Sequence, residues 1–252
     1  QRDANRKYAY SAKETLSLMQ SLYERHKLLT YPRTDSRYIS DDVVSTLPER
    51  LKSVMVDEYR DLARAILMKR PLQTRFLVDN ARVTDHHAIL PTEEQPELFR
   101  LSGPERNIYD LVVRRFLAVL LPPCEYEETR LTLTVGGETF TARGKIMKEP
   151  GWRAAYGLFL LEEDEEEEGE EREQSLPPLR QGDSVEVLSA RVSTGKTAPP
   201  KRYTEATLLT AMEHPPTQGM DRAQGKILEE TGGLGTPATR ADIIEKLFSA
   251  FY

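Results

Sequence analysis

Cysteine is almost absent from this 252-residue chain: Cys124 stands alone, and histidine occurs only four times. A single thiol excludes an intramolecular disulfide and fits a reducing cytoplasm. One cysteine with four histidines also does not supply the usual ligand spacing of a zinc site. No apolar run approaches the roughly 18 residues that a membrane-spanning helix needs. We therefore expect a cytoplasmic protein without structural zinc and without a membrane partner.

Basic residues are outnumbered by acidic ones, and the net charge of −6 at first argues against a nucleic-acid partner. Most of the negative charge lies in residues 162–173, EEDEEEEGEERE, where ten acids and one arginine give −9. The other 240 residues therefore sum to +3. We expect the acidic run to be a disordered, solvated loop. The alternative is a DNA mimic that screens a basic groove until substrate displaces it.

The segment Leu28–Ser36, LLTYPRTDS, places Tyr31 at the end of a short apolar run and Arg33 two residues later. A phenol is a nucleophile that can form a covalent intermediate, and a guanidinium can hold phosphate oxygens through two parallel hydrogen bonds. Pro32 stiffens the backbone between these side chains. The pattern indicates attack on a phosphodiester, although three residues alone also fit an ordinary half-buried tyrosine.

Two longer motifs follow in the chain: HHAILPT at residues 86–92 and GLGTPATRA at residues 233–241. Together with LTYPRTDSRY at residues 29–38, they resemble the motifs of type IA DNA topoisomerases, and specifically those of the topoisomerase III branch. Three ordered motifs are a specific signal. The resemblance covers almost the whole chain and is weakest between residues 161 and 199.

The resemblance implies that Tyr31 attacks a backbone phosphate of single-stranded DNA and becomes a 5′-phosphotyrosine. It implies that Arg33 stabilises the developing negative charge, and that His86 contacts the scissile phosphate or relays a proton. Other motif residues are expected to contact DNA: Asp35, Ser36, His87, Thr236, Thr239 and Arg240. Structural alternatives stay open, because loop histidines often bond to carbonyls and threonines often cap helices.

Type IA enzymes hold Mg²⁺ on the acidic residues of an N-terminal Toprim domain, marked by an Asp-x-Asp element that this sequence lacks. The first residue is glutamine rather than methionine. We therefore expect a fragment that carries the nucleophile but no metal site, and that is inactive alone. The glycines at 232–235 are not followed by Gly-Lys-Ser/Thr, so the use of ATP is not indicated.

The resemblance also implies strand passage through a protein-bridged gate in the intact enzyme, followed by resealing without ATP. Single-stranded DNA is the expected partner, and we expect a monomer. RNA stays open as a further substrate, because contacts to a 2′-hydroxyl cannot be inferred from the sequence.

Helical periodicity and alternating strand patterns are separated along the chain, which predicts an α+β fold. A capping pattern at Ser11 predicts a helix that leads into a short strand, and Gly136-Gly137 between alternating runs predicts a β-hairpin. Alternation also predicts a strand at Ser184–Val192. By resemblance, the domains are a helical tyrosine-bearing domain at 1–100, a β-rich gate or arch domain at 101–195, and part of a helical base domain at 196–252.

Two other classes of protein remain as alternatives. A non-catalytic module that binds single-stranded nucleic acid would keep the fold without forming a covalent adduct. A recombinase or relaxase would also use a tyrosine nucleophile. Relaxases usually need a histidine cluster, and recombinases use several arginines around a tyrosine near the C-terminus; this chain matches neither pattern.

Overall fold

A computed structural model of the chain describes residues 1–157, 176–215, 226–228 and 232–250. The acidic run at 162–173, expected to be a solvated loop, lies outside the described residues.

The chain forms two compact units. One unit is built from Gln1–Pro122 together with Tyr203–Tyr252, and the other from Pro123–Arg202. The C-terminal segment thus belongs to the same unit as the N-terminal helices, although the second unit separates them in the sequence. The assignment of a tyrosine-bearing, a gate and a base domain stays a prediction.

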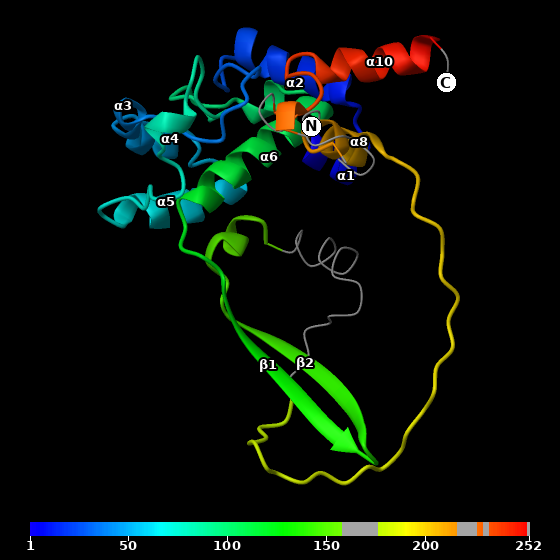
Figure 1. Ribbon diagram of the computed structural model, residues 1–252. Helices are drawn as coiled ribbons and strands as arrows, with labels where there is room; N and C mark the ends of the chain where they lie inside the picture. The colour runs from blue at the N-terminus through cyan, green and yellow to red at the C-terminus, as the bar shows by residue number, and fades with distance from the viewer. Residues whose placement is uncertain (158–175, 216–225, 229–231, 251–252) are drawn as a thin grey trace. The chain divides into compact units, whose positions relative to one another are not determined.

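The first unit is helical (Figure 1). Its helices and short 3₁₀ turns are α1 (Arg2–Tyr8), α2 (Ala12–Glu24), α3 (Asp41–Val44), α4 (Leu47–Ser53), η1 (Asp57–Tyr59), α5 (Arg60–Met68), η2 (Asn80–Arg82), η3 (Leu98–Arg100), α6 (Gly103–Val119), α8 (Glu205–Glu213) and α10 (Arg240–Ala250).

Local capping signals set the starts of the two longest of these helices. The Ser11 side chain accepts a hydrogen bond from the Glu14 amide, which confirms the predicted start of α2. Helix α6 begins with a full capping box between Ser102 and Glu105. The two helices pack against each other. Their fully buried side chains form much of the core of the first unit: Leu22, Ile108, Tyr109, Val113, Phe116 and Leu117.

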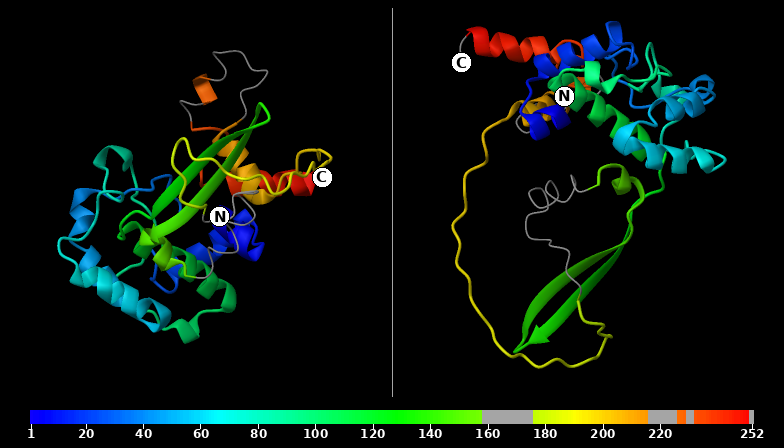
Figure 2. Two further views of the ribbon diagram at one scale, coloured as in Figure 1. Left: turned by 90° about the horizontal axis from the view of Figure 1, so that it is seen from below. Right: turned by 180° about the vertical axis from the view of Figure 1, so that it is seen from behind.

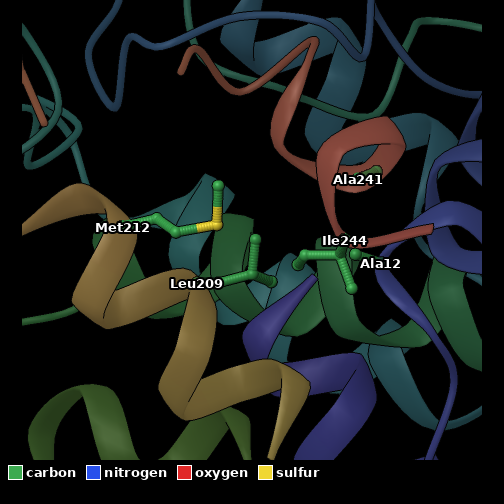
Figure 3. Packing of buried hydrophobic residues seen from close by; sticks show 5 residues of the cluster. All are labelled: Ala12, Leu209, Met212, Ala241 and Ile244. Atoms are coloured by element: carbon green, nitrogen blue, oxygen red, sulfur yellow. The ribbon is translucent and has the colours of Figure 1, made fainter. Parts of the chain in front are cut away.

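Helices α8 and α10 attach to the N-terminal end of α2 through a small apolar cluster. Leu209 and Met212 of α8 face Ala241 and Ile244 of α10, with Ala12 of α2 beside them (Figure 3). A side-chain carboxylate supports this contact, because Glu205 accepts a 2.7 Å hydrogen bond from the Ala12 amide. Residues about 200 positions apart in the sequence are therefore joined in one core.

The second unit contains a β-hairpin of β1 (Glu125–Val135) and β2 (Glu138–Glu149), whose strands run side by side in both views of Figure 2. Val135 pairs with Glu138 across the turn, where Gly136 and Gly137 have φ values of 60° and 89°. A two-residue turn with both φ values positive is the type I′ hairpin turn, so the predicted hairpin is confirmed.

The predicted strand at Ser184–Val192 is wrong: these residues form no strand, and Val187, Leu188 and Val192 are exposed. Alternation alone does not make a strand, because a strand needs a partner for its backbone groups. Among the described residues, the sheet of the second unit contains only β1 and β2.

After β2, Arg153 of the 3₁₀ turn η4 (Gly151–Ala155) donates a 2.7 Å hydrogen bond to the Tyr126 hydroxyl of β1.

A buried carboxylate links α2 to α6. Glu105 is 6 % exposed and accepts hydrogen bonds from the Ser21 hydroxyl at 2.6 Å and from the Ser102 amide at 2.9 Å. The His26 imidazole lies 3.2 Å away. Burial alone would raise the pKa of Glu105, but the hydrogen bonds to Ser21 and Ser102, together with His26, lower it to about 2.

We predict that Glu105→Gln lowers the free energy of unfolding at pH 7 by about 1–3 kcal/mol, because it removes the charged acceptor from a buried network. The lowered pKa means that the carboxylate contributes its full stability above about pH 4.5 and loses it as the pH falls through about 2. Urea unfolding at pH 7 and pH 3 measures both effects. A variant with wild-type stability and wild-type acid sensitivity would contradict this assignment.

Candidate active site

The tyrosine segment lies beside the segment that contains the two histidines. Leu29 forms an isolated antiparallel bridge with Pro91, the Thr30 amide donates to the Leu90 carbonyl at 2.9 Å, and the Thr92 amide donates to the Leu28 carbonyl at 3.0 Å. The predicted short strand at 28–31 is therefore only a bridge. Even so, it aligns two motifs that are more than fifty residues apart in the sequence.

Threonine hydroxyls extend this short pairing. The Thr30 hydroxyl accepts a 2.9 Å hydrogen bond from the Leu90 amide, and the Thr92 hydroxyl donates to the Lys27 carbonyl at 2.6 Å. Thr34 reaches the same partner segment, since its hydroxyl donates to the His86 carbonyl at 3.0 Å. These bonds replace the regular ladder that such short segments cannot form.

The pairing brings the Tyr31 and His86 rings to 4.4 Å between centroids, with an angle of 42° between their planes. The Tyr23 ring of α2 also packs edge-on against Tyr31, with 5.6 Å between ring centroids and 82° between the planes. Tyr31 is half-buried, whereas His86 is exposed. No hydrogen bond joins the phenol to the imidazole among the described residues. The Tyr31 ring therefore packs against two other aromatic rings, and one of them, His86, is exposed to solvent.

The remaining residues of the tyrosine segment differ in what they contact. In the part of the chain that the structure describes, Arg33 and Asp35 are exposed and make no hydrogen bond or ion pair, with each other or with other residues. Ser36 instead shapes the loop: its hydroxyl donates to the Arg82 carbonyl at 2.8 Å and accepts from the Tyr38 amide at 3.1 Å. Arg33 is therefore available to a ligand, while Ser36 is engaged with the backbone.

The His87 ring lies beside the backbone of the next residue. Its Nδ1 lies 2.7 Å from the Ala88 carbonyl, and its side chain is half-buried. It also lies close enough to Asp42 to help lower the pKa of that carboxyl, which a hydrogen bond from Ser40 lowers most strongly. Its predicted contact with DNA stays a prediction, but the structure gives this histidine protein partners of its own.

The glycine motif forms a loop around one arginine. Arg240 is 7 % exposed, and its guanidinium donates to the carbonyls of Gly232 at 2.8 Å, Leu234 at 3.1 Å and Gly235 at 3.2 Å. Arg240 thus holds the loop from the inside. Its predicted contact with DNA stays a prediction, with most of its donors already engaged.

Thr236 and Thr239 cap the helix that follows. The Thr236 amide donates to the Thr239 hydroxyl at 2.9 Å, and that hydroxyl lies 3.1 Å from the Thr236 hydroxyl. Both side chains are exposed. At the start of α8, Thr204 and Thr207 form a complete capping box, of which the bond from the Thr236 amide to the Thr239 hydroxyl matches one half. Both threonines thus stabilise the helix start, and their exposure leaves the predicted contact with a DNA backbone open.

A family model described as DNA topoisomerase matches residues 1–252. The chain belongs to this family. Relatives named DNA topoisomerase 3 are 52% identical over 253 residues in Bacillus licheniformis and 51% identical over 253 residues in Bacillus subtilis strain 168. Each alignment covers 100% of this chain and 34% of the relative, so the chain spans about a third of their length.

A solved structure of full-length topoisomerase I from Thermotoga maritima has a TM-score of 0.62, with 24% sequence identity, over 99% of this chain and 36% of that one. That likeness concerns the fold alone and confirms the predicted mixed helix-and-strand fold of a type IA topoisomerase. The family model and the relatives confirm the predicted family, the topoisomerase III branch of type IA.

The described part of this topoisomerase chain contains no cluster of three potential metal ligands. Among the described residues, no three of the histidine, cysteine, aspartate and glutamate side chains gather closely enough to hold a metal. Mg²⁺ prefers positioned carboxylates in octahedral geometry. The described residues therefore offer no three-ligand site for the metal that the family implies. None of the described helices has the length and apolar character to cross a membrane.

Two residues of α4 that lie outside the sequence motifs support the histidine segment through its backbone carbonyls. Arg50 of α4 is 8 % exposed and donates to the Pro91 carbonyl at 2.8 Å, and the Ser53 hydroxyl donates to the Thr92 carbonyl at 2.7 Å. Nothing in the pattern of α4 indicates this contact. An arginine and a serine on a short helix are ordinary surface residues until the tertiary structure buries them.

We predict that Gly233→Ala destabilises the glycine loop far more than Gly232→Ala. Both glycines have positive φ, 90° and 71°, so alanine costs about 1–2 kcal/mol at either position. A Cβ at Gly233 would also lie 2.2 Å from the Met212 carbonyl oxygen, whereas one at Gly232 meets nothing within 4 Å. Urea unfolding should show roughly 1–3 kcal/mol of additional loss for Gly233→Ala. Equal losses would show that the loop does not depend on this close approach.

Proposed function

We propose that this chain carries the nucleophile of a type IA topoisomerase of the III branch, and that Tyr31 attacks a phosphodiester of single-stranded DNA. The observation that supports this most strongly is the contact between Tyr31 and His86, produced by the pairing of two sequence motifs. A phenol needs a base to act near neutral pH, and imidazole is the usual side chain for this purpose.

In the proposed reaction, the Tyr31 oxygen bonds to phosphorus and the P–O3′ bond breaks. The phenolic proton passes to the His86 imidazole, and the departing 3′-oxygen takes up a proton. The product is a 5′-phosphotyrosine, which keeps the energy of the phosphoester, so resealing by the 3′-hydroxyl needs no ATP. The exposed guanidinium of Arg33 supplies positive charge that stabilises the phosphoryl oxygens, which become more negative in the transition state.

The glycine loop and its threonine caps are proposed to hold the DNA backbone. A helix N-terminus with exposed hydroxyls and glycines attracts phosphate groups. Asp35, Ser36 and His87 would line the same strand, and Ser36 and His87 do so from positions set by their backbone bonds.

In the intact protein, we propose strand passage and rejoining, with residues 1–100 bearing the tyrosine, 101–195 forming the gate, and 196–252 holding DNA. Mg²⁺ is proposed to bind a part of the protein outside this chain, so the isolated chain is expected not to relax supercoils. Single-stranded DNA, with RNA as a second candidate, is the proposed partner of a monomeric, cytoplasmic enzyme.

We predict that Tyr31→Phe abolishes the covalent adduct, because it removes the nucleophilic oxygen. The full-length protein that contains this chain would be incubated with a single-stranded oligonucleotide and Mg²⁺, quenched with denaturant, and mapped by mass spectrometry. Tyr23→Phe is the matched control, because it removes a phenolic hydroxyl but keeps the ring that packs on Tyr31. The adduct should therefore still form on Tyr31. Tight binding without any adduct in the unmodified protein would favour the non-catalytic binding module.

We predict that His86→Ala slows single-turnover cleavage by about 10²–10⁴-fold if the imidazole takes the phenolic proton. The rate would be measured at saturating oligonucleotide. His87→Ala serves as the comparison, because the His87 ring is bonded to the Ala88 carbonyl, whereas the histidine ring that packs on Tyr31 is that of His86. Equal rates for His86→Ala and the unmodified protein would exclude the proton-transfer step.

A further inference from the structure

Glu213, the last residue of α8, holds two arginines from distant parts of the chain. Its Oε2 lies 2.7 Å from Arg2 Nη1, and its Oε1 lies 3.1 Å from Arg37 Nη2. Arg37 belongs to the segment that follows Tyr31, between Ser36 and Tyr38. One carboxylate therefore connects the tyrosine segment to the C-terminal end of α8.

This position is unfavourable for an acid unless it is paired. The C-terminal end of a helix carries partial negative charge, which repels a carboxylate. The side chain of Glu213 is 27% exposed, and burial by itself would raise its pKa. The neighbouring charges of Arg2 and Arg37 nevertheless lower the pKa of Glu213. The carboxylate is thus kept ionised by the two arginines that it holds.

The backbone of the same turn supports the glycine loop. The Leu234 amide donates a 2.6 Å hydrogen bond to the Met212 carbonyl. A Cβ at Gly233 would lie 2.5 Å from the Glu213 carbonyl oxygen, so the loop rests directly on this turn. The end of α8 therefore contacts the glycine loop through its backbone and the tyrosine segment through the Glu213 side chain.

We propose that Glu213 is a positioning residue, which sets the tyrosine segment against the glycine loop through its ion pair with Arg37. This inference rests on the proposed function, because it concerns the placement of Tyr31 relative to the loop that would hold the DNA backbone. Glu213 lies outside the three sequence motifs.

Magnitudes separate this role from one in stability. The Arg37 side chain is 68% exposed, and ion pairs of this kind contribute little to folding. Misplacement of a reacting group by about 1 Å, in contrast, can cost about 10²-fold in rate. Loss of the ion pair should therefore slow cleavage much more than it destabilises the fold.

The test uses the full-length protein with Glu213→Gln, Arg37→Gln and the double variant. We expect each single variant to cleave a saturating single-stranded oligonucleotide about tenfold more slowly, within the range that misplacement produces. The double variant should be no slower than Glu213→Gln alone, because that change already breaks the contact with Arg37 as well as the one with Arg2. Melting temperatures should stay close to that of the unmodified protein, and oligonucleotide affinity should change little for Glu213→Gln.

Glu49→Gln is the matched control, since it neutralises an acid in an exposed ion pair with Lys52 within α4. It should cleave at the unmodified rate. If Glu213→Gln fails to fold, Arg37→Gln still tests the contact from its exposed side. Unmodified rates for Arg37→Gln, or losses that multiply in the double variant, would overturn the inference. An adduct that persists in Tyr31→Phe would instead overturn the proposed function, so the two failures are distinguishable.

Discussion

The alignment of the tyrosine segment with the histidine segment is the contact on which the site depends. Neither segment is long enough to form a β-ladder, and their pairing is a single bridge between Leu29 and Pro91 with a few flanking hydrogen bonds. Buried side chains on both segments, among them Leu28 and Leu90, exclude water from these bonds. Short backbone pairing is then stable because breaking it would expose unpaired polar groups within an apolar environment.

Two arginines in the same loop differ in their partners, and this difference matches the two roles proposed for them, binding for Arg33 and positioning for Arg37. Among the described residues, Arg33 is exposed and makes no hydrogen bond or ion pair, whereas Arg37 is held by Glu213. A guanidinium that must meet an incoming phosphate gains from being unpaired, because no existing ion pair has to be broken first. A guanidinium that orients a loop gains from a fixed partner. Residue type alone does not distinguish these two uses.

The glycine loop shows a similar division within one motif. Arg240 occupies the inside of the loop and bonds to its carbonyls, while Thr236 and Thr239 remain exposed at the helix start. Gly233 permits the close approach to the end of α8. Arg240 therefore holds the loop carbonyls together, and Gly233 allows the loop to lie against the end of α8. The two threonines are the exposed side chains of the motif.

Three ordered motifs were enough to predict the family from the sequence. The capped start of α2 at Ser11 and the hairpin turn at Gly136-Gly137 could also be predicted, because each depends on residues close together in the chain. The sequence pattern misassigned Ser184–Val192, since alternation cannot show whether a partner strand exists.

The tertiary structure was needed to show that the His86 ring packs on Tyr31, that Arg240 is buried, and that Glu213 meets Arg37. These contacts join residues far apart in the sequence. Their geometry follows from how the helices pack, and no local pattern of residues encodes it.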